Sequence, residues 1–189
     1  MANARIGKPR IFTDWINPLI HQNYIDIANN DISFNASTST CANPEIFKAF
    51  DLKPTNLATI SCDGNSDDLE IIIDTNLNNN TDFGYMDYIA ILNHNLKEAG
   101  AKVTLQSGEV SNYADVNSLT ELSNVDSISG AEFTPDYNGY SLASFSPDTS
   151  AGNDYFKITI STDSTYSSDI KIGAIMIGKM YDFPHAPDV

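Results

Sequence analysis

The residues best suited to bind a metal ion are the oxygen side chains that begin at Asp63. Asp63, Asn65 and Asp67 alternate along one short segment, and Asp74 stands at the twelfth position counted from Asp63. Carboxylate and amide oxygens at this spacing are ligands that calcium prefers. The sixth position is Asp68 instead of the glycine of an EF-hand, and a strand-like segment follows in place of a helix. The pattern predicts either a weak structural calcium site or a solvated acidic turn, and no other cofactor.

The sequence contains no recognisable enzyme motif. The three histidines, His21, His94 and His185, are far apart, and no HExxH, GxSxG, P-loop or GxGxxG pattern occurs. With 25 acidic residues some pair of carboxylates is inevitable, so such a pair does not indicate a glycosidase. His94 stands between two asparagines directly after an apolar segment, and we expect it to satisfy backbone groups of a turn. We predict that the chain is not an enzyme.

The chain is strongly acidic, and its charge is unevenly distributed. The 25 acidic and 10 basic residues give a net charge of −15, and all of it lies in residues 61–189, because residues 1–60 carry five of each sign. Duplex DNA and anionic membranes repel such a surface, so neither nucleic acid nor membrane is an expected partner. The sequence shows no apolar run of membrane-spanning length and no signal peptide, which predicts a soluble chain without an export signal.

The elements predicted from hydropathy are nearly all strands. Apolar residues alternate or run continuously over residues 8–15, 58–62, 69–74, 86–92, 101–106, 155–161 and 169–180. The most apolar of these segments, residues 86–92, is expected at the centre of a sheet. Residues 28–43 are predicted to form a polar loop, and short helical turns are expected at residues 44–50 and 115–122. Gly173 stands where the alternation of apolar and polar residues shifts by one position, which predicts a β-bulge. Short strands without alternating helices favour an antiparallel β-sandwich.

Three segments carry a resemblance to a known group of proteins. They are residues 4–15 (ARIGKPRIFTDW), residues 87–105 (DYIAILNHNLKEAGAKVTL) and residues 172–189 (IGAIMIGKMYDFPHAPDV). These segments resemble galactose-binding-like (discoidin-related) jelly-roll domains of tailed-phage proteins, whereas residues 110–150 carry no resemblance. The resemblance implies an all-β jelly-roll sandwich with one or two short helices. We expect one domain over residues 1–189, with an N-terminal arm or first strand at 1–20 and an irregular tail at 181–189.

The resemblance also implies a role, although a fold alone does not set function. It implies a virion structural protein, made in the host cytoplasm and associated with the tail, baseplate or fibre attachment. Such a protein acts by assembly with other virion subunits, as a homo-oligomer or a hetero-assembly. Capsid decoration is the alternative within the same class.

A carbohydrate-binding module for host-surface glycans is the other function that the resemblance suggests. Sugar binding uses exposed aromatic rings beside amide and carboxylate groups. The stretch without resemblance contains suitable residues, namely Tyr113, Tyr137, Asn138 and Tyr140, and Tyr155 and Tyr166 are further candidates. The alternative is that these tyrosines lie at the edges of the sandwich with hydrated hydroxyl groups.

The two ends of the chain are candidates for contact with a partner protein. Tryptophan, arginine and large apolar residues are enriched at the centres of protein interfaces. Both ends contain such residues, and the predicted interface consists of Arg5, Arg10, Phe12, Trp15, Tyr181 and Phe183. The alternative is an ordinary first strand that covers its own core.

Overall fold

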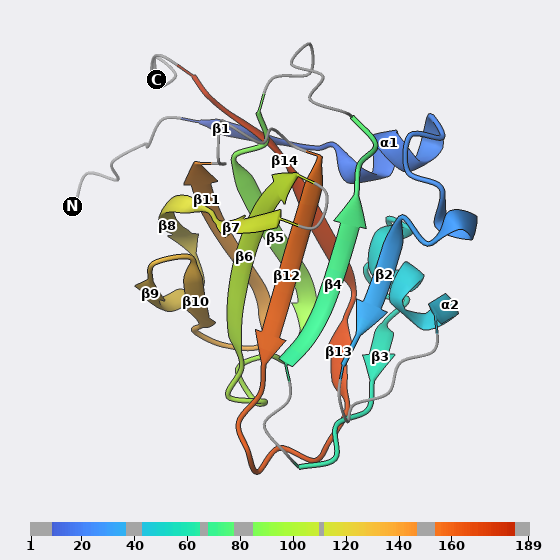
Figure 1. Cartoon of the computed structure of the whole chain (residues 1–189). Helices are drawn as coiled ribbons and strands as arrows, with labels where there is room; N and C mark the ends of the chain where they lie inside the picture. Colours follow the sequence, from blue (N-terminus) through green and yellow to red (C-terminus); the bar gives the residue numbers. More distant parts are fainter. Residues whose placement is uncertain are drawn as a thin grey trace, which may run out of the picture.

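The structure is a computed structural model that describes residues 9–36, 43–64, 68–77, 85–109, 112–146 and 154–183 (Figure 1). Two large sheets face each other, and every strand pair is antiparallel. In order, the five-stranded sheet contains β1 (Arg10–Asp14), β14 (Ala174–Asp182), β5 (Tyr88–His94), β11 (Gly139–Ser146) and β8 (Asn117–Ser123). The predicted antiparallel jelly-roll sandwich is confirmed.

The second large sheet has seven strands. In order these are β2 (Ile32–Asn35), β4 (Asp68–Asp74), β12 (Tyr155–Ser161), β6 (Lys102–Glu109), β10 (Glu132–Pro135) and β9 (Val125–Ser129), with β7 (Asn112–Asp115) also paired to β6. A small sheet joins β13 (Ile170–Ile172) to β3 (Ala58–Ile60). The helices are short: α1 (Ile16–His21), α2 (Asn43–Ile46), and the 3-10 turns η1 (Ile27–Asn29) and η2 (Phe47–Phe50). No helix in the described part of the chain is long and apolar enough to cross a membrane.

The core lies between the two large sheets because their strands alternate apolar and polar side chains. In β12 every second residue is buried, and the buried Ile158 lies directly between Ile71 of β4 and Leu105 of β6. Side chains on one face of a strand point the same way, so these rows form one apolar layer. The expected strands at residues 69–74 and 155–161 are confirmed.

Strand β5 lies in the middle of the five-stranded sheet and is buried on both faces, as its apolar sequence predicted. Ile89 and Ile91 face the core, whereas Tyr88 lies on the outer face beside Gly178 of β14. The Tyr88 ring packs edge-on against Phe12, with 5.1 Å between ring centroids. The Tyr88 hydroxyl has no hydrogen-bond partner in the described structure, and burial, helped by nearby Asp14 and Asp87, raises its pKa.

This unsatisfied hydroxyl predicts that Tyr88→Phe stabilises the fold. A buried hydroxyl without a partner costs desolvation free energy, so its removal should raise the free energy of unfolding by about 1 kcal/mol. The matched control is Tyr155→Phe, because the Tyr155 hydroxyl donates to Asp74 Oδ2 at 2.6 Å and its loss should be destabilising. Urea unfolding of both variants checks the prediction, and equal losses of stability would contradict it.

Residues 112–146 form strands where the sequence predicted little regular structure. The helical turn expected at residues 115–122 is wrong, because β7 and β8 occupy this segment. In β8 only Leu119 is buried, because this edge strand exposes its other face and has a neighbour on one side only. The polar loop expected at residues 28–43 likewise contains β2, a four-residue edge strand that buries Ile32. Edge strands need few apolar residues, so their hydropathy signal is weak.

Gly173 separates two strands instead of forming the predicted bulge within one. β13 ends at Ile172 and pairs with β3, whereas β14 begins at Ala174 and pairs with β5. The shift in the apolar alternation at Gly173 therefore marks the point where the chain leaves one sheet and enters another.

Candidate functional site

A polar pocket lies at the end of the sandwich where the β5–β6 and β12–β13 loops meet, at the lower end of the molecule in Figure 1. Its volume is about 400 Å³, within the range of small-molecule sites. Loops that a rigid sheet holds in place are common positions for binding residues. The pocket is lined by Asn95, Glu98, Tyr166, Ser168, Asp169 and Lys171.

The two loops are held together by backbone contacts. The N–H of Asp163 donates to the carbonyl of Ala99 at 3.0 Å. Gly100 beside it has a φ of +57°, and a Cβ at this position would lie 3.0 Å from the Cβ of Asp163. Glycine adopts this backbone conformation without strain and permits the close approach. Gly100 therefore sets how closely the two loops can approach.

Asn95 is the centre of a hydrogen-bond network that connects the loops with β13. Its amide nitrogen donates to the Tyr166 hydroxyl at 3.0 Å and to the Asp169 carbonyl at 2.9 Å. Its amide oxygen accepts from the backbone N–H of Lys171 at 2.7 Å. The Tyr166 hydroxyl in turn donates to the Asp169 carbonyl at 3.0 Å. This arrangement fixes the rotamers of Asn95 and Tyr166 before any ligand arrives.

The side-chain charges of the pocket remain available to a ligand. In the described part of the chain, no hydrogen bond or ion pair engages the Glu98 carboxylate, the Ser168 hydroxyl or the Lys171 ammonium. The Asp169 carboxylate accepts one hydrogen bond, from Ser61 at 3.1 Å. The pocket thus offers donors and acceptors around one aromatic ring.

Tyr166 stays a neutral phenol over the whole physiological range. Partial burial and the nearby Glu98 carboxylate raise its pKa, whereas the hydrogen bond from Asn95 opposes this shift. Its hydroxyl is therefore a donor and an acceptor at neutral pH.

The predicted glycan residues are divided between the pocket and other places. Tyr166 lines the pocket, whereas Asn138 lies next to it, where its side-chain oxygen accepts from the backbone N–H of Glu98 at 3.0 Å. Tyr137 is 50% exposed in the turn before β11. Tyr140 lies on the outer face of the five-stranded sheet, with its hydroxyl 3.3 Å from that of Ser123. The side chain of Tyr113 lies outside the described residues, although its backbone belongs to β7.

The structure describes two of the four predicted calcium ligands, Asp63 and Asp74. Asp74 stands at the end of β4 (Asp68–Asp74), a strand roughly 20 Å long at the usual rise per residue, whereas Asp63 precedes β4. Asp74 instead accepts hydrogen bonds from Tyr155 and the backbone of Asn76. Asn65 and Asp67 lie outside the described residues, and within the described ranges no group of three acidic, histidine or cysteine side chains could hold a metal. A turn site at Asp63 stays a prediction.

His94 holds the turn after β5, in the role expected from its neighbours. Its Nδ1 accepts the backbone N–H of Leu96 at 3.2 Å. Its Nε2 lies 3.1 Å from the Ser141 hydroxyl, which donates to the carbonyl of Asn124 at 3.2 Å. Nε2 must therefore carry the proton and donate to Ser141. Burial lowers the pKa of His94 to about 4, so the ring is neutral at physiological pH.

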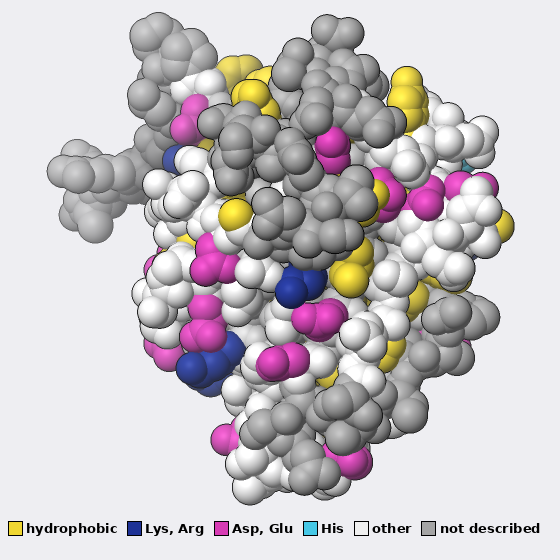
Figure 2. Space-filling model, viewed as in Figure 1, with side chains coloured by type: hydrophobic (Ala, Val, Ile, Leu, Met, Phe, Trp, Pro, Cys, Tyr) yellow, Lys and Arg dark blue, Asp and Glu magenta, His cyan; other side chains and the backbone are white. Residues whose placement is uncertain are grey.

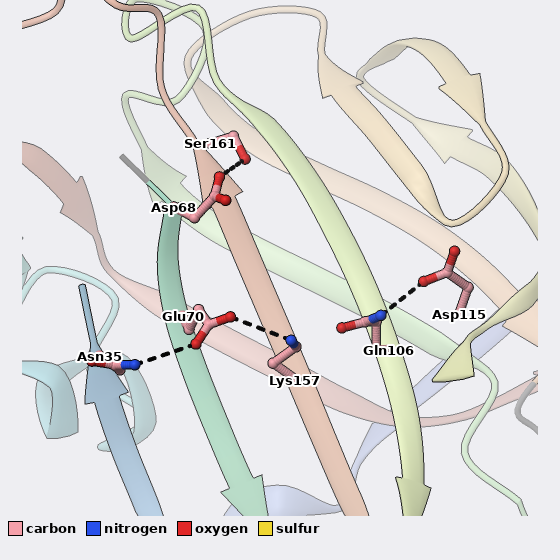
Figure 3. A network of polar contacts seen from close by, with 7 residues as sticks. All are labelled: Asn35, Asp68, Glu70, Gln106, Asp115, Lys157 and Ser161. Atoms are coloured by element: carbon pink, nitrogen blue, oxygen red, sulfur yellow. Dashed lines mark hydrogen bonds and ion pairs between the residues drawn. The ribbon is translucent and has the colours of Figure 1, made fainter. Parts of the chain in front are cut away.

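The outer face of the seven-stranded sheet is polar, and its polar groups bind one another (Figures 2 and 3). Glu70 accepts from Asn35 at 3.4 Å and from Lys157 at 3.3 Å. Gln106 donates to Asp115 at 2.9 Å on the same face. Acidic side chains are spread over this face with basic ones among them. These mutually satisfied pairs indicate a solvated sheet face and not a binding site.

The predicted interface residues gather along β1 and β14. Arg10 and Asp182 form an ion pair at 2.6 Å, and Phe12 is 37% exposed. Trp15 lines an apolar pocket of about 340 Å³ at the end of β1. Tyr181 and Phe183 are 50% and 45% exposed, respectively, whereas Arg5 lies outside the described residues.

Comparison with known proteins finds likeness among solved structures alone. No family model and no curated protein matches the chain. Chitosan-binding module 1 of a chitosanase/glucanase from Paenibacillus sp. IK-5 aligns with 79% of this chain and 96% of its own, at 16% identity and a TM-score of 0.49. A family 32 carbohydrate-binding module from Clostridium perfringens, solved with galactose, aligns with 82% of this chain and 98% of its own, at 13% identity and a TM-score of 0.47.

A third neighbour is module CBM32-1 of a family 31 glycoside hydrolase from Clostridium perfringens. It covers 79% of this chain and 95% of its own, at 14% identity and a TM-score of 0.47. With identities of 16% or less and TM-scores below 0.5, these likenesses assign no role to any residue of this chain. The phage part of the sequence resemblance is tested by none of them and stays a prediction.

Most residues of the polar pocket show no pattern in the sequence that predicts a site. Tyr166 was among the candidate sugar-binding tyrosines, and Asn95 belonged to the turn motif around His94. Nothing in the sequence linked these two positions, because 71 residues separate them. Glu98 and Lys171 resemble any other charged surface residue, and only the meeting of two loops distinguishes them.

Proposed function

We propose that this chain is a non-catalytic carbohydrate-binding module whose ligand occupies the polar pocket between the β5–β6 and β12–β13 loops. The observation that carries the proposal is the preformed network of Asn95, Tyr166 and Asp169 beside the free polar groups of Glu98, Ser168 and Lys171. Sugar hydroxyls both donate and accept hydrogen bonds, so they suit a pocket that offers both kinds of partner. The ring of Tyr166 supplies an apolar surface for the C–H face of a sugar.

The charges of the pocket favour neutral sugars over anionic ones. Two carboxylates, Glu98 and Asp169, surround the single ammonium group of Lys171, and the whole chain carries a net charge of −15. Like charges raise the free energy of binding, so sialic and uronic acids should be disfavoured. A single hexose, at about 0.3 kcal/mol per heavy atom, should bind with a Kd on the order of millimolar.

A glycan array followed by calorimetry tests this function. The wild-type chain should bind at least one neutral glycan, and Glu98→Gln and Lys171→Met should each weaken that binding by about tenfold or more, because each loses a hydrogen bond to a charged group. The matched control for Glu98→Gln is Glu121→Gln, which makes the same charge change at an exposed position of β8. Absence of any array signal, or equal binding by all variants, would overturn the proposal.

The predicted place of the chain in a tailed-phage virion, with other virion subunits as partners, is compatible with glycan binding. It stays a prediction from the sequence resemblance. Mass spectrometry of purified particles tests it separately, because a glycan-binding module need not be a virion component.

A further inference from the structure

The free edge of the five-stranded sheet is formed by β1, which pairs with β14 on one side. Phe183 donates its N–H to the carbonyl of Pro9, and Trp15 donates its N–H to the carbonyl of Ile177. Backbone groups of successive residues alternate in direction, so odd-numbered residues of β1 point to β14. The N–H and C=O groups of Arg10, Phe12 and Asp14 therefore point to the open side, where no described residue pairs with them.

The helix that follows β1 leaves the end of this edge open. Its N-cap is Trp15, whose carbonyl accepts from the N–H of Leu19 at 3.0 Å. The Asp14 carbonyl precedes the helical hydrogen bonds and gains no partner from them. The Asp14 side chain turns to the helix instead and accepts from the backbone of Ile16 at 3.1 Å and from the Asn17 amide at 2.5 Å.

The side chains of β1 are apolar and exposed at its centre. Ile11 is 47% exposed and Phe12 is 37% exposed. Natural sheets usually protect a free edge with charges, and an exposed apolar edge strand is a template for pairing. The opposite edge strand, β8, exposes polar residues such as Thr120 and Glu121. The unprotected edge of this sheet is therefore β1.

The sequence of β1 is complementary to itself in the antiparallel direction. When two copies pair about a two-fold axis at Phe12, Arg10 of each copy lies opposite Asp14 of the other, and Phe12 lies opposite Phe12. These are the residues whose backbone groups point outward, so the hydrogen-bonded positions coincide with the charge pairs. On the other face, Ile11 lies opposite Thr13.

Arg10 could pair with a carboxylate on each side of it in such a dimer. Arg10 already forms an ion pair with Asp182 on the neighbouring strand at 2.6 Å. Asp14 is partly buried, and burial raises its pKa, with no basic residue among the causes of the shift. The guanidinium group of Arg10 from a second copy would lie beside this carboxylate. It would then stand between Asp14 of the first copy and Asp182 of its own copy.

We propose that two copies of this chain associate through antiparallel pairing of their β1 strands, which joins the two five-stranded sheets into one continuous sheet. Pairing of this kind uses the open backbone groups of the edge and one self-complementary surface, as a two-fold interface requires. The interface lies at the opposite end of the molecule from the polar pocket, so it is independent of the proposed glycan binding.

Sedimentation velocity over about 1–500 µM protein tests the oligomeric state. The wild type should show a concentration-dependent dimer, and Arg10→Glu should raise the dissociation constant at least tenfold, because it sets two like-charge pairs across the axis. The matched control is Lys102→Glu, which makes the same charge change and breaks an exposed ion pair, Lys102–Glu132, away from β1. A monomer at all concentrations, or equal weakening by both variants, overturns the proposal.

Cross-linking tests the register of the two strands. In a Cys41→Ser background, Phe12→Cys places two thiols at the axis, where the Cα atoms of a hydrogen-bonded pair are about 5.5 Å apart and a disulfide can form. Mild oxidation should convert Phe12→Cys to a covalent dimer and leave Thr120→Cys, on the other edge strand, monomeric. Equal cross-linking of the two variants, or a dimer that Phe12→Cys does not trap, would show that another surface is used and overturn the proposal.

Discussion

Gly173→Ala is expected to destabilise the fold by about 3 kcal/mol or more, a large fraction of the stability of a domain of this size. A Cβ at Gly173 would lie 2.1 Å from the carbonyl oxygen of Pro54 and 2.8 Å from the Cβ of Asn93. The Pro54 carbonyl cannot withdraw easily, because the Asn93 side chain donates to it at 2.7 Å. The added methyl group must therefore displace the backbone where β13 ends and β14 begins.

Gly130→Ala is the matched control for this prediction. Gly130 has a φ of +62° and no atom within 4 Å of an added Cβ, so its substitution incurs backbone strain without a clash. That strain costs roughly 1–2 kcal/mol. Urea unfolding followed by circular dichroism should rank Gly173→Ala well below Gly130→Ala in stability. A Gly173→Ala variant as stable as the control would contradict the steric argument.

Mild acid is expected to remove about 3 kcal/mol of stability through His94. Burial lowers its pKa from 6.5 to about 4, so between these values the unfolded chain binds a proton that the folded chain does not. Stability from this group is complete above pH 6.5 and falls as the pH falls through about 4. Protonation of Nδ1 would also abolish the hydrogen bond from Leu96.

Urea unfolding at several pH values between 7.5 and 4.5 measures the effect of His94. His94→Gln should be less stable at pH 7.5, and its loss of stability on acidification should be smaller than that of the wild type. Carboxylates also titrate near pH 4, and the raised pKa of the Asp14 carboxyl has the opposite effect on stability. The informative quantity is therefore the difference between the wild type and His94→Gln in the stability lost on acidification. His21→Gln makes the same substitution at an exposed position and is the control for the loss of a histidine. If the stability of His94→Gln depends on pH as that of the wild type does, the role assigned to His94 is wrong.

Strands with a strong apolar pattern could be predicted because their pattern reflects burial directly. The expected ranges 69–74 and 155–161 match β4 and β12, and the segment at residues 86–92 proved to be the central strand β5. The edge strands β2 and β8 could not be predicted, because a strand that is paired on one side only needs few apolar residues. Helix α1 was also missed, since its six residues are too few to show a helical period.

The sequence by itself determined the class of fold, the role of His94 and the acidity that disfavours anionic partners. These properties depend on composition and on neighbours within a few residues. Tertiary structure decided which polar groups meet: it joined Asn95 to Tyr166 and Asp169, and it joined Asp74, at the end of β4, to Tyr155. The physical reason is that the pocket is made of loops that the sheets bring together. The hydropathy pattern around a charged loop residue does not indicate which residues of another loop it will meet.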